Sequence, residues 1–415
     1  MSTIAGPTAA EGKTSKGKMR PTGQGTMLGA IFLMATSAIG PGFITQTTTF
    51  TVRLTAAFAF AIMVSVIVDI AVQLNVWRVI GVSGQRANAL GNAVLPGLGW
   101  FLGIMVALGG LVFNVGNIAG GGLGLNAIFD LDARVGGIIT AAIGIAIFLW
   151  KAAGKVMDRM VIVLGAVMIL LMLYVTIISH PPYGEALRQM ILPERVEFLT
   201  ITTLIGGTVG GYITYSGAHR MLDSDRTGPE HVREVSNASI LGVCVTGVMR
   251  FLLFLAILGV VTQGAKLTGA ANPSAAAFEF AAGKLGLRLF GVILWGASIT
   301  SVIGAAFTSV SFLTKASTPQ RTRNLITVVF ILVSSVVYIA VGKAPTTLLI
   351  VAGAVNGLIL PIGFAIMLWV AWRRRDLMQG YVYPKWLLII GVLVWLLTIY
   401  LGWRSLEGLA ALWRG

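Results

Sequence analysis

The sequence predicts an all-α polytopic membrane protein with about eleven transmembrane helices. Of its 415 residues, 56% are hydrophobic and only 11% are charged, and the mean hydropathy is +0.88. A soluble domain of this size could not bury so much apolar surface in one core. A helix needs about 20 apolar residues to cross a bilayer, and such runs occur at 26–49, 54–80, 98–126, 135–150, 161–178, 199–217, 238–261, 290–313, 325–341, 348–370 and 386–403.

The loop charges predict the orientation of these spans. Residues 1–24 are polar and basic and are expected to form a disordered cytoplasmic tail, followed by one transmembrane domain at 25–415. Lys and Arg gather in loops after the even-numbered spans, as in Arg373-Arg374-Arg375, and are sparser and acid-balanced elsewhere. This bias predicts a cell-membrane protein with its N-terminus inside and its C-terminus outside. The net charge of +15 therefore reflects orientation in the lipid bilayer rather than nucleic-acid binding.

Enzyme and disulfide-scaffold classes find no support in the motifs. The single cysteine, Cys244, lies in an apolar segment. The chain carries no phosphate-binding Gly-rich loop with lysine, no HExxH, no Gly-x-Ser-x-Gly and no CxxC. The His/Asp group formed by His219, Asp223, Asp225 and His231 lacks metal-ligand spacing and is expected to be solvated in a cytoplasmic loop. No enzymatic activity and no cofactor are expected.

The first span is interrupted by Gly40-Pro41-Gly42. Proline removes a backbone donor and clashes with the preceding turn, and glycine adds backbone freedom. A cluster of neutral polar side chains follows, Thr45 to Thr49, with Gln46 among them. Broken helices with free carbonyls and hydroxyls form the substrate sites of many transporters. The alternative is a proline-kinked helix packed on small neighbours.

The sixth span repeats this feature with Gly206, Gly207, Gly210 and Gly211. Each glycine weakens a helix by about 1 kcal/mol relative to alanine. Two interrupted helices five spans apart are typical of two five-helix inverted repeats with the site between them. The expected repeats are about 26–180 and 198–373, with an extra helix at about 384–404. Close helix packing is the alternative reason for the glycines.

Four motifs resemble the NRAMP metal-ion transporter family. From Leu28, LGAIFLMATSAIGPGF is similar to the family's first helix, which carries Asp-Pro-Gly-Asn where this chain has Gly40-Pro41-Gly42-Phe43. The run 208–212 (Thr-Val-Gly-Gly-Tyr) resembles Thr-Val-Met-Pro-His of helix six. The run 113–117 resembles the acidic stretch of helix three, and Leu360-Pro361 the family's Leu-Pro. The resemblance implies a LeuT-type 5+5 fold with helices 1 and 6 unwound at the midplane.

The departures from this family concern its metal and proton sites. Gly40, Phe43 and Gly210 stand where the family has its metal-binding aspartate, asparagine and methionine, so no direct metal ligand is expected. Neutral Asn114, Asn117 and Tyr212 replace the acids and the histidine of the proton route. A branch with similar losses, the NRAMP-related magnesium transporters, suggests Mg²⁺ carried as a largely hydrated ion without proton coupling. The candidate substrate-binding residues are Gly40, Phe43, Gln46, Thr47, Asn114, Asn117, Gly210, Gly211 and Tyr212.

Two other functions remain open. The same fold could carry a small neutral or zwitterionic organic solute, whose carboxylate would bind at unwound helix ends. The chain could also be a non-transporting sensor or scaffold. The lone charges Asp69 and Arg250 lie within apolar runs, where charged residues default to function or pairing. They could form a structural pair, but Arg250 would repel cations if it faced the cavity.

Overall fold

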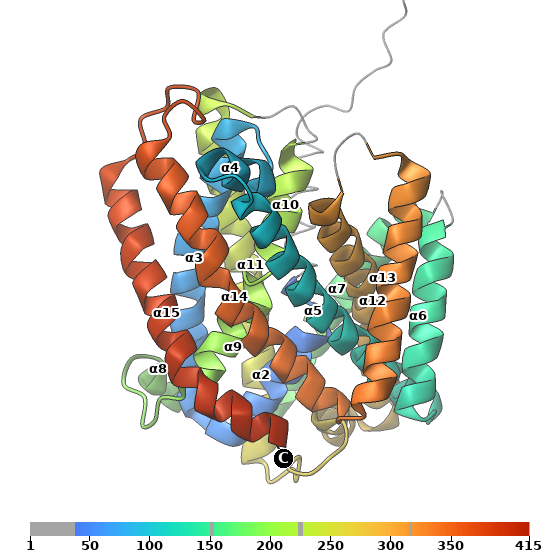
Figure 1. Ribbon diagram of the computed structural model, residues 1–415. Coiled ribbons are helices and arrows are strands. Elements are labelled where there is room, and N and C mark those ends of the chain that lie inside the picture. The colour runs from blue at the N-terminus through green and yellow to red at the C-terminus, as the bar shows by residue number, and fades with distance from the viewer. Residues whose placement is uncertain (1–37, 150–152, 223–226, 315–317, 415) are drawn as a thin grey trace, which may run out of the picture.

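The computed structural model describes residues 38–149, 153–222, 227–314 and 318–414, so the expected tail lies outside it. All regular secondary structure in these ranges is helical (Figure 1). The α-helices are α2 (Pro41–Leu54), α3 (Phe58–Ser83), α4 (Ala87–Val94), α5 (Leu98–Phe129), α6 (Ala133–Leu149), α7 (Ala153–Ser179), α8 (Tyr183–Ile191), α9 (Phe198–Thr208), α10 (Ile213–Leu222), α11 (Val232–Thr262), α12 (Pro273–Leu313), α13 (Gln320–Val341), α14 (Pro345–Arg373) and α15 (Lys385–Arg414).

Each predicted span coincides with a helix or a helix pair in the described chain, except that residues 26–37 of the first span lie outside the described residues. By length and composition alone, seven helical stretches within the described residues could cross a membrane, or eight if the bent pair α7–α8 is one span. This number is below eleven because α2 and α3 are joined by a short 3-10 turn and count as one stretch, and because α6 has only 17 residues. The sixth span also fails the length criterion, since it is split into α9 and α10 with 11 and 10 residues.

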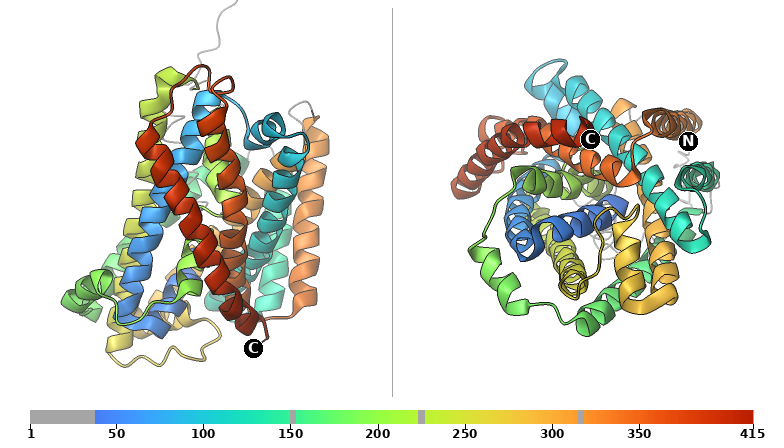
Figure 2. Two further views of the ribbon diagram at one scale, coloured as in Figure 1. Left: turned by 60° about the vertical axis from the view of Figure 1, so that its left-hand side comes forward. Right: turned by 90° about the horizontal axis from the view of Figure 1, so that it is seen from below.

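Helices five spans apart in the chain pack against each other. The second span (α3) packs against the seventh (α11), and the third (α5) packs against the eighth (α12). Glycine makes the α5–α12 contact close: a Cβ at Gly124 would lie 2.7 Å from the Trp295 backbone nitrogen, and one at Gly110 would lie 1.8 Å from Ser309 Oγ. Seen along the bundle, α2 lies near the centre while α13 and α15 lie at the periphery (Figure 2).

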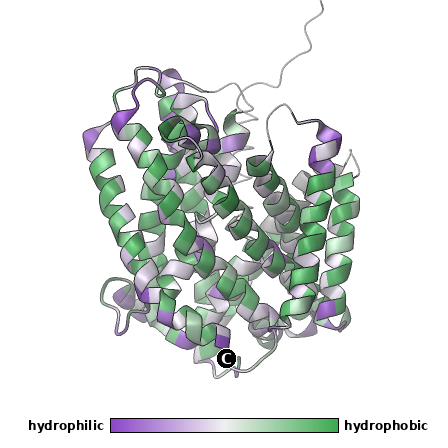
Figure 3. Ribbon diagram, in the orientation of Figure 1, coloured by the Kyte–Doolittle hydropathy of each residue, from purple (hydrophilic) through white to green (hydrophobic). Residues whose placement is uncertain are grey.

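Polar residues gather at the two ends of the bundle, with an apolar band between them (Figure 3). One end carries α4 and the α14–α15 loop, including Arg374 and Asp376. The other end carries α8, the start of α9 and the C-terminal end of α15 (Figure 1). There Arg188 pairs with Glu185 and Glu194. These loops thus lie at opposite ends of the bundle, while the count of eleven crossings and the assignment of each end to a side of the membrane stay predictions.

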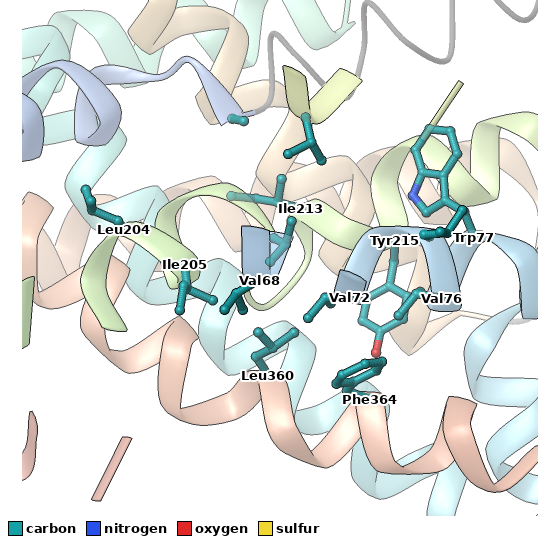
Figure 4. Close-up of a cluster of buried hydrophobic side chains, with 14 of the residues drawn as sticks. Val68, Val72, Val76, Trp77, Leu204, Ile205, Ile213, Tyr215, Leu360 and Phe364 are labelled. Carbon is teal, nitrogen blue, oxygen red and sulfur yellow. The ribbon is translucent and has the colours of Figure 1, made fainter. Parts of the chain in front are cut away.

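A hydrophobic cluster supports the interrupted sixth span. Val68, Val72 and Val76 of α3 pack with Ile205 and Ile213, and α14 adds Leu360 and Phe364 (Figure 4). Two hydrogen bonds fix α10 on the same helix: Trp77 Nε1 donates to the Thr214 carbonyl (2.9 Å), and Thr214 Oγ1 donates to Gln73 Oε1 (2.8 Å). Helix α3 therefore holds both halves of the broken span in place.

Candidate functional site

The first span is broken at the position that the sequence predicted. Ile39 and Gly40 are not helical, and α2 begins at Pro41 with Gly40 as its N-cap. No side chain of the described residues caps this helix end. The threonine hydroxyls that follow do not reach toward the break, because Thr47, Thr48 and Thr51 each donate to the carbonyl four residues earlier in α2.

The sixth span is unwound at Val209–Tyr212, between the end of α9 and the start of α10. Gly211 adopts a φ of +52°, which favours glycine. A Cβ there would also lie only 1.6 Å from Asn356 Oδ1. Because α2 packs against α9, the two breaks lie close together in the buried interior. The sixth span is therefore interrupted, and the described part of the first span begins at the break that the resemblance implied.

The positions that the resemblance matches to the family's metal ligands leave little space for a longer side chain. A Cβ at Gly40 would lie 2.7 Å from Ser301 Oγ, and one at Gly210 would lie 2.5 Å from the Gly206 carbonyl oxygen. The third position is filled by the ring of Phe43, which is 2% exposed. Within the described ranges, no three His, Cys, Asp or Glu residues are grouped so that they could hold a metal ion.

Arg250 of α11 contacts both interrupted spans. Its guanidinium lies over the Phe43 ring, 4.4 Å from the centroid, and its Nη1 donates to Thr208 Oγ1 (2.9 Å) at the end of α9. The side chain is 2% exposed, and its Nε and Nη2 atoms have no hydrogen-bond partner among the described residues. Asp69 lies within electrostatic range of Arg250 and beside Thr208, but no ion pair joins the two charges. Arg250 therefore faces the breaks.

A second group of side chains surrounds Gly40 and Tyr212. Asn117 Oδ1 and Ser301 Oγ are the polar atoms nearest to a Cβ at Gly40. Asn117 also lies beside Tyr212. The Tyr212 ring packs edge-on against Phe113, with centroids 5.6 Å apart. Gly40, Phe43, Asn117, Gly210, Gly211 and Tyr212 are thus brought together at the breaks.

The remaining predicted site residues are engaged in contacts between or within helices. Gln46 Nε2 donates to the Leu349 carbonyl (2.9 Å), and Asn114 Nδ2 donates to Ser334 Oγ of α13 (3.2 Å). Thr47 is bonded within α2. A role of these three residues in substrate binding remains a prediction.

The list of site residues from the sequence omitted Arg250, Thr208, Ser301 and Asp69. In the sequence, Arg250 and Asp69 stand out as lone charges in apolar runs, but the sequence does not show which residues these charges contact.

The expectation for the His/Asp group is wrong for His219, which is buried and stacks on Phe312 with centroids 4.9 Å apart. Asp223 and Asp225 lie outside the described residues. Asn356 does make the expected interhelical bond, to the Gly109 carbonyl (3.0 Å).

Comparison with known proteins identifies the family. A sequence model of the Natural resistance-associated macrophage protein-like (Nramp) family matches residues 31–406. The chain belongs to the Nramp family. It is 48% identical over 378 residues to the uncharacterized membrane protein YcsG of Bacillus subtilis, covering 91% of this chain and 93% of that protein. Nramp proteins are transporters, so at the family level the chain is a membrane transport protein and not an enzyme.

Two solved structures confirm the fold class. The manganese transporter of Eremococcus coleocola superposes with a TM-score of 0.74 at 17% identity, covering 97% of this chain and 91% of that one. MhsT in complex with L-phenylalanine superposes with a TM-score of 0.64 at 15% identity, covering 92% of this chain and 98% of that one. At these identities the likeness concerns the fold alone, which is of the LeuT type.

Proposed function

We propose that this Nramp protein is an alternating-access transporter that binds its substrate between the breaks of the first and sixth spans. Three features support this. The breaks lie side by side, their residues are buried, and the N-terminus of α2 is left without a side-chain cap. Unwound backbone is tolerated at this depth when it lines a cavity or is buried in protein, and sites at such breaks are common in transporters.

The geometry favours a small organic solute over a metal ion as the substrate. This choice depends on one observation: the guanidinium of Arg250 lies on the ring of Phe43. Phe43 is the residue that the resemblance matches to a metal ligand of the family. A dication about 6 Å from this charge would be repelled by on the order of 5 kcal/mol at an effective dielectric constant of about 20. Asp69, if ionised, would offset part of that repulsion. Neither Gly40 nor Gly210 has room for a carboxylate or thioether that would offset the rest.

The second candidate substrate is Mg²⁺ without proton coupling, which family membership favours. Mg²⁺ releases its waters reluctantly, and a largely hydrated ion needs hydrogen-bonding groups more than direct ligands. The Asn117 amide, the Ser301 hydroxyl and the Tyr212 hydroxyl could bind those waters. This mechanism requires Asp69 to stay charged and to neutralise Arg250.

Purified protein in liposomes tests both candidates. Mg²⁺ and Mn²⁺ entry and internal pH would be followed with dyes, and uptake of labelled L-phenylalanine, L-proline and neutral amides would be measured in parallel. Empty liposomes are the blank, and Arg53→Gln, which alters an exposed ion pair with Glu197, is a matched control.

We expect uptake of an organic solute without divalent flux. Mg²⁺ entry at constant internal pH would instead establish the second candidate, and metal-driven acidification would exclude its uncoupled mechanism. Absence of uptake for every probe would refute transport by this protein and favour the sensor or scaffold.

A further inference from the structure

We propose that Arg250 binds a carboxylate of the transported solute and holds it against the uncapped N-terminus of α2. This inference rests on the proposed transport function and names the chemical class of its substrate, a small carboxylic acid or amino acid. Arg250, to which this role is assigned, is not one of the positions that the resemblance matches to the family's metal ligands.

The guanidinium of Arg250 has hydrogen-bond donors without a partner among the described residues. One nitrogen, Nη1, is used by Thr208, while Nε and Nη2 lack partners within the described chain. These two atoms form one edge of the planar guanidinium, the edge that binds a carboxylate with two parallel hydrogen bonds. The face of the guanidinium is held by the Phe43 ring, and this contact orients the free edge.

The N-terminus of α2 lies beside Arg250. Helix α2 has 14 residues and starts at Pro41, and no side chain among the described residues caps its N-terminus with a hydrogen bond. Phe43, whose ring contacts the Arg250 guanidinium, lies in this first turn. The free N–H groups and the dipole of a helix N-terminus favour an anion. Two independent positive features, the guanidinium and the helix end, thus meet at one buried position.

Arg250 and Asp69 do not have the contacts of a purely structural ion pair. A buried structural pair is stable only with close contact and with its remaining donors and acceptors satisfied. Arg250 and Asp69 lie near each other without an ion pair, and Thr208 lies beside Asp69. Because the Thr208 hydroxyl donates to the Leu204 carbonyl, neither carboxylate oxygen of Asp69 has a geometrically formed hydrogen bond in the described ranges. This arrangement fits a site in which Asp69 balances the charge of Arg250 until a substrate carboxylate arrives.

The test uses matched pairs of probes that differ only in the carboxylate. Uptake of L-phenylalanine and L-proline would be compared with uptake of their carboxamides, and benzoate with benzamide, in liposomes containing wild type, Arg250→Gln, Arg250→Lys or the control Arg53→Gln. We expect the acids to be preferred. We also expect Arg250→Gln to raise the KM for an acid by at least about 10- to 100-fold, because it removes the charge and at least one of the two hydrogen bonds to the carboxylate. Arg250→Lys should lie in between, and Arg53→Gln should match wild type.

Several results would overturn the inference. Equal uptake of acid and amide by wild type would do so, as would an unchanged KM for the acid in a monodisperse Arg250→Gln protein. If Arg250→Gln does not fold, Thr208→Val, which removes the partner of Nη1, carries the test. It should raise the KM for the acid and not for a neutral solute, and an equal change for both would contradict the proposal. Wild-type uptake of Mg²⁺ or amides alone would refute this inference but not transport, whereas uptake of no probe would refute transport itself.

Discussion

A single methyl group added at Gly40 tests how closely the first break approaches α12. The Cβ of Gly40→Ala would lie 2.7 Å from Ser301 Oγ and 3.5 Å from Ser301 Cβ. The backbone of Gly40 (φ −92°, ψ −174°) suits alanine, so the cost comes from the contact alone. Ser301 is buried on α12, so the methyl group fits only if the Ser301 hydroxyl rotates away from it within the packed helix contact. Such overpacking costs about 1–3 kcal/mol.

The same geometry predicts a specific rescue. Ser301→Ala removes the oxygen at 2.7 Å and leaves the Cβ at 3.5 Å, an ordinary contact. The Ser301 hydroxyl has no hydrogen-bond partner among the described residues, so its loss alone should change stability little. The double variant should therefore unfold with nearly the free energy of wild type. The coupling between the two positions should be about 1–3 kcal/mol.

Denaturation by SDS in mixed micelles would measure the unfolding free energy of wild type, both single variants and the double variant. Gly304→Ala on α12 is the matched control, because a Cβ there has no neighbour within 4 Å. In a helix this change should stabilise by up to about 1 kcal/mol. A Gly40→Ala protein as stable as wild type, or additive effects of the two substitutions, would refute the close approach of the first break to α12.

Three further predictions follow from other contacts. Gly211→Ala should destabilise by more than about 2 kcal/mol in the same SDS assay, because a positive φ and a Cβ 1.6 Å from Asn356 Oδ1 act together; wild-type stability would contradict the unwound geometry. Thr214→Val should cost about 1–3 kcal/mol, since it leaves Gln73 Oε1 buried without its donor; an unchanged unfolding free energy would show that this bond does not hold α10. Phe43→Asn, which introduces the family's residue, should produce no Mn²⁺ binding by calorimetry because Arg250 stays in place; measurable Mn²⁺ affinity would contradict the electrostatic argument.

The positions of the spans and of both breaks could be predicted from the sequence because they depend on local properties. Apolar length decides which segments can cross a bilayer, and the conformational limits of proline and glycine decide where a helix stops. The family motifs then identified Gly40, Phe43 and Gly210 as positions that have lost their ligands. None of these inferences required knowledge of which helices are neighbours.

The lining of the site depends on contacts between segments distant in the chain. Asn114 and Asn117 are three residues apart on α5, yet Asn114 meets Ser334 of α13 while Asn117 lies at the break. Only the packing of α5 decides which side chain points where. His219 shows the same limit, because its burial against Phe312 depends on how α10 packs on α12.

The sequence by itself determined that this protein is a helical membrane transporter of the Nramp family with two interrupted helices and without the usual metal ligands. Composition, helix-breaking residues and motifs depend only on the order of residues in the chain. Only the tertiary structure decided that Arg250 lies over Phe43 and against Thr208. Electrostatic energy depends on distance in space, and only packing brings this charge to the breaks.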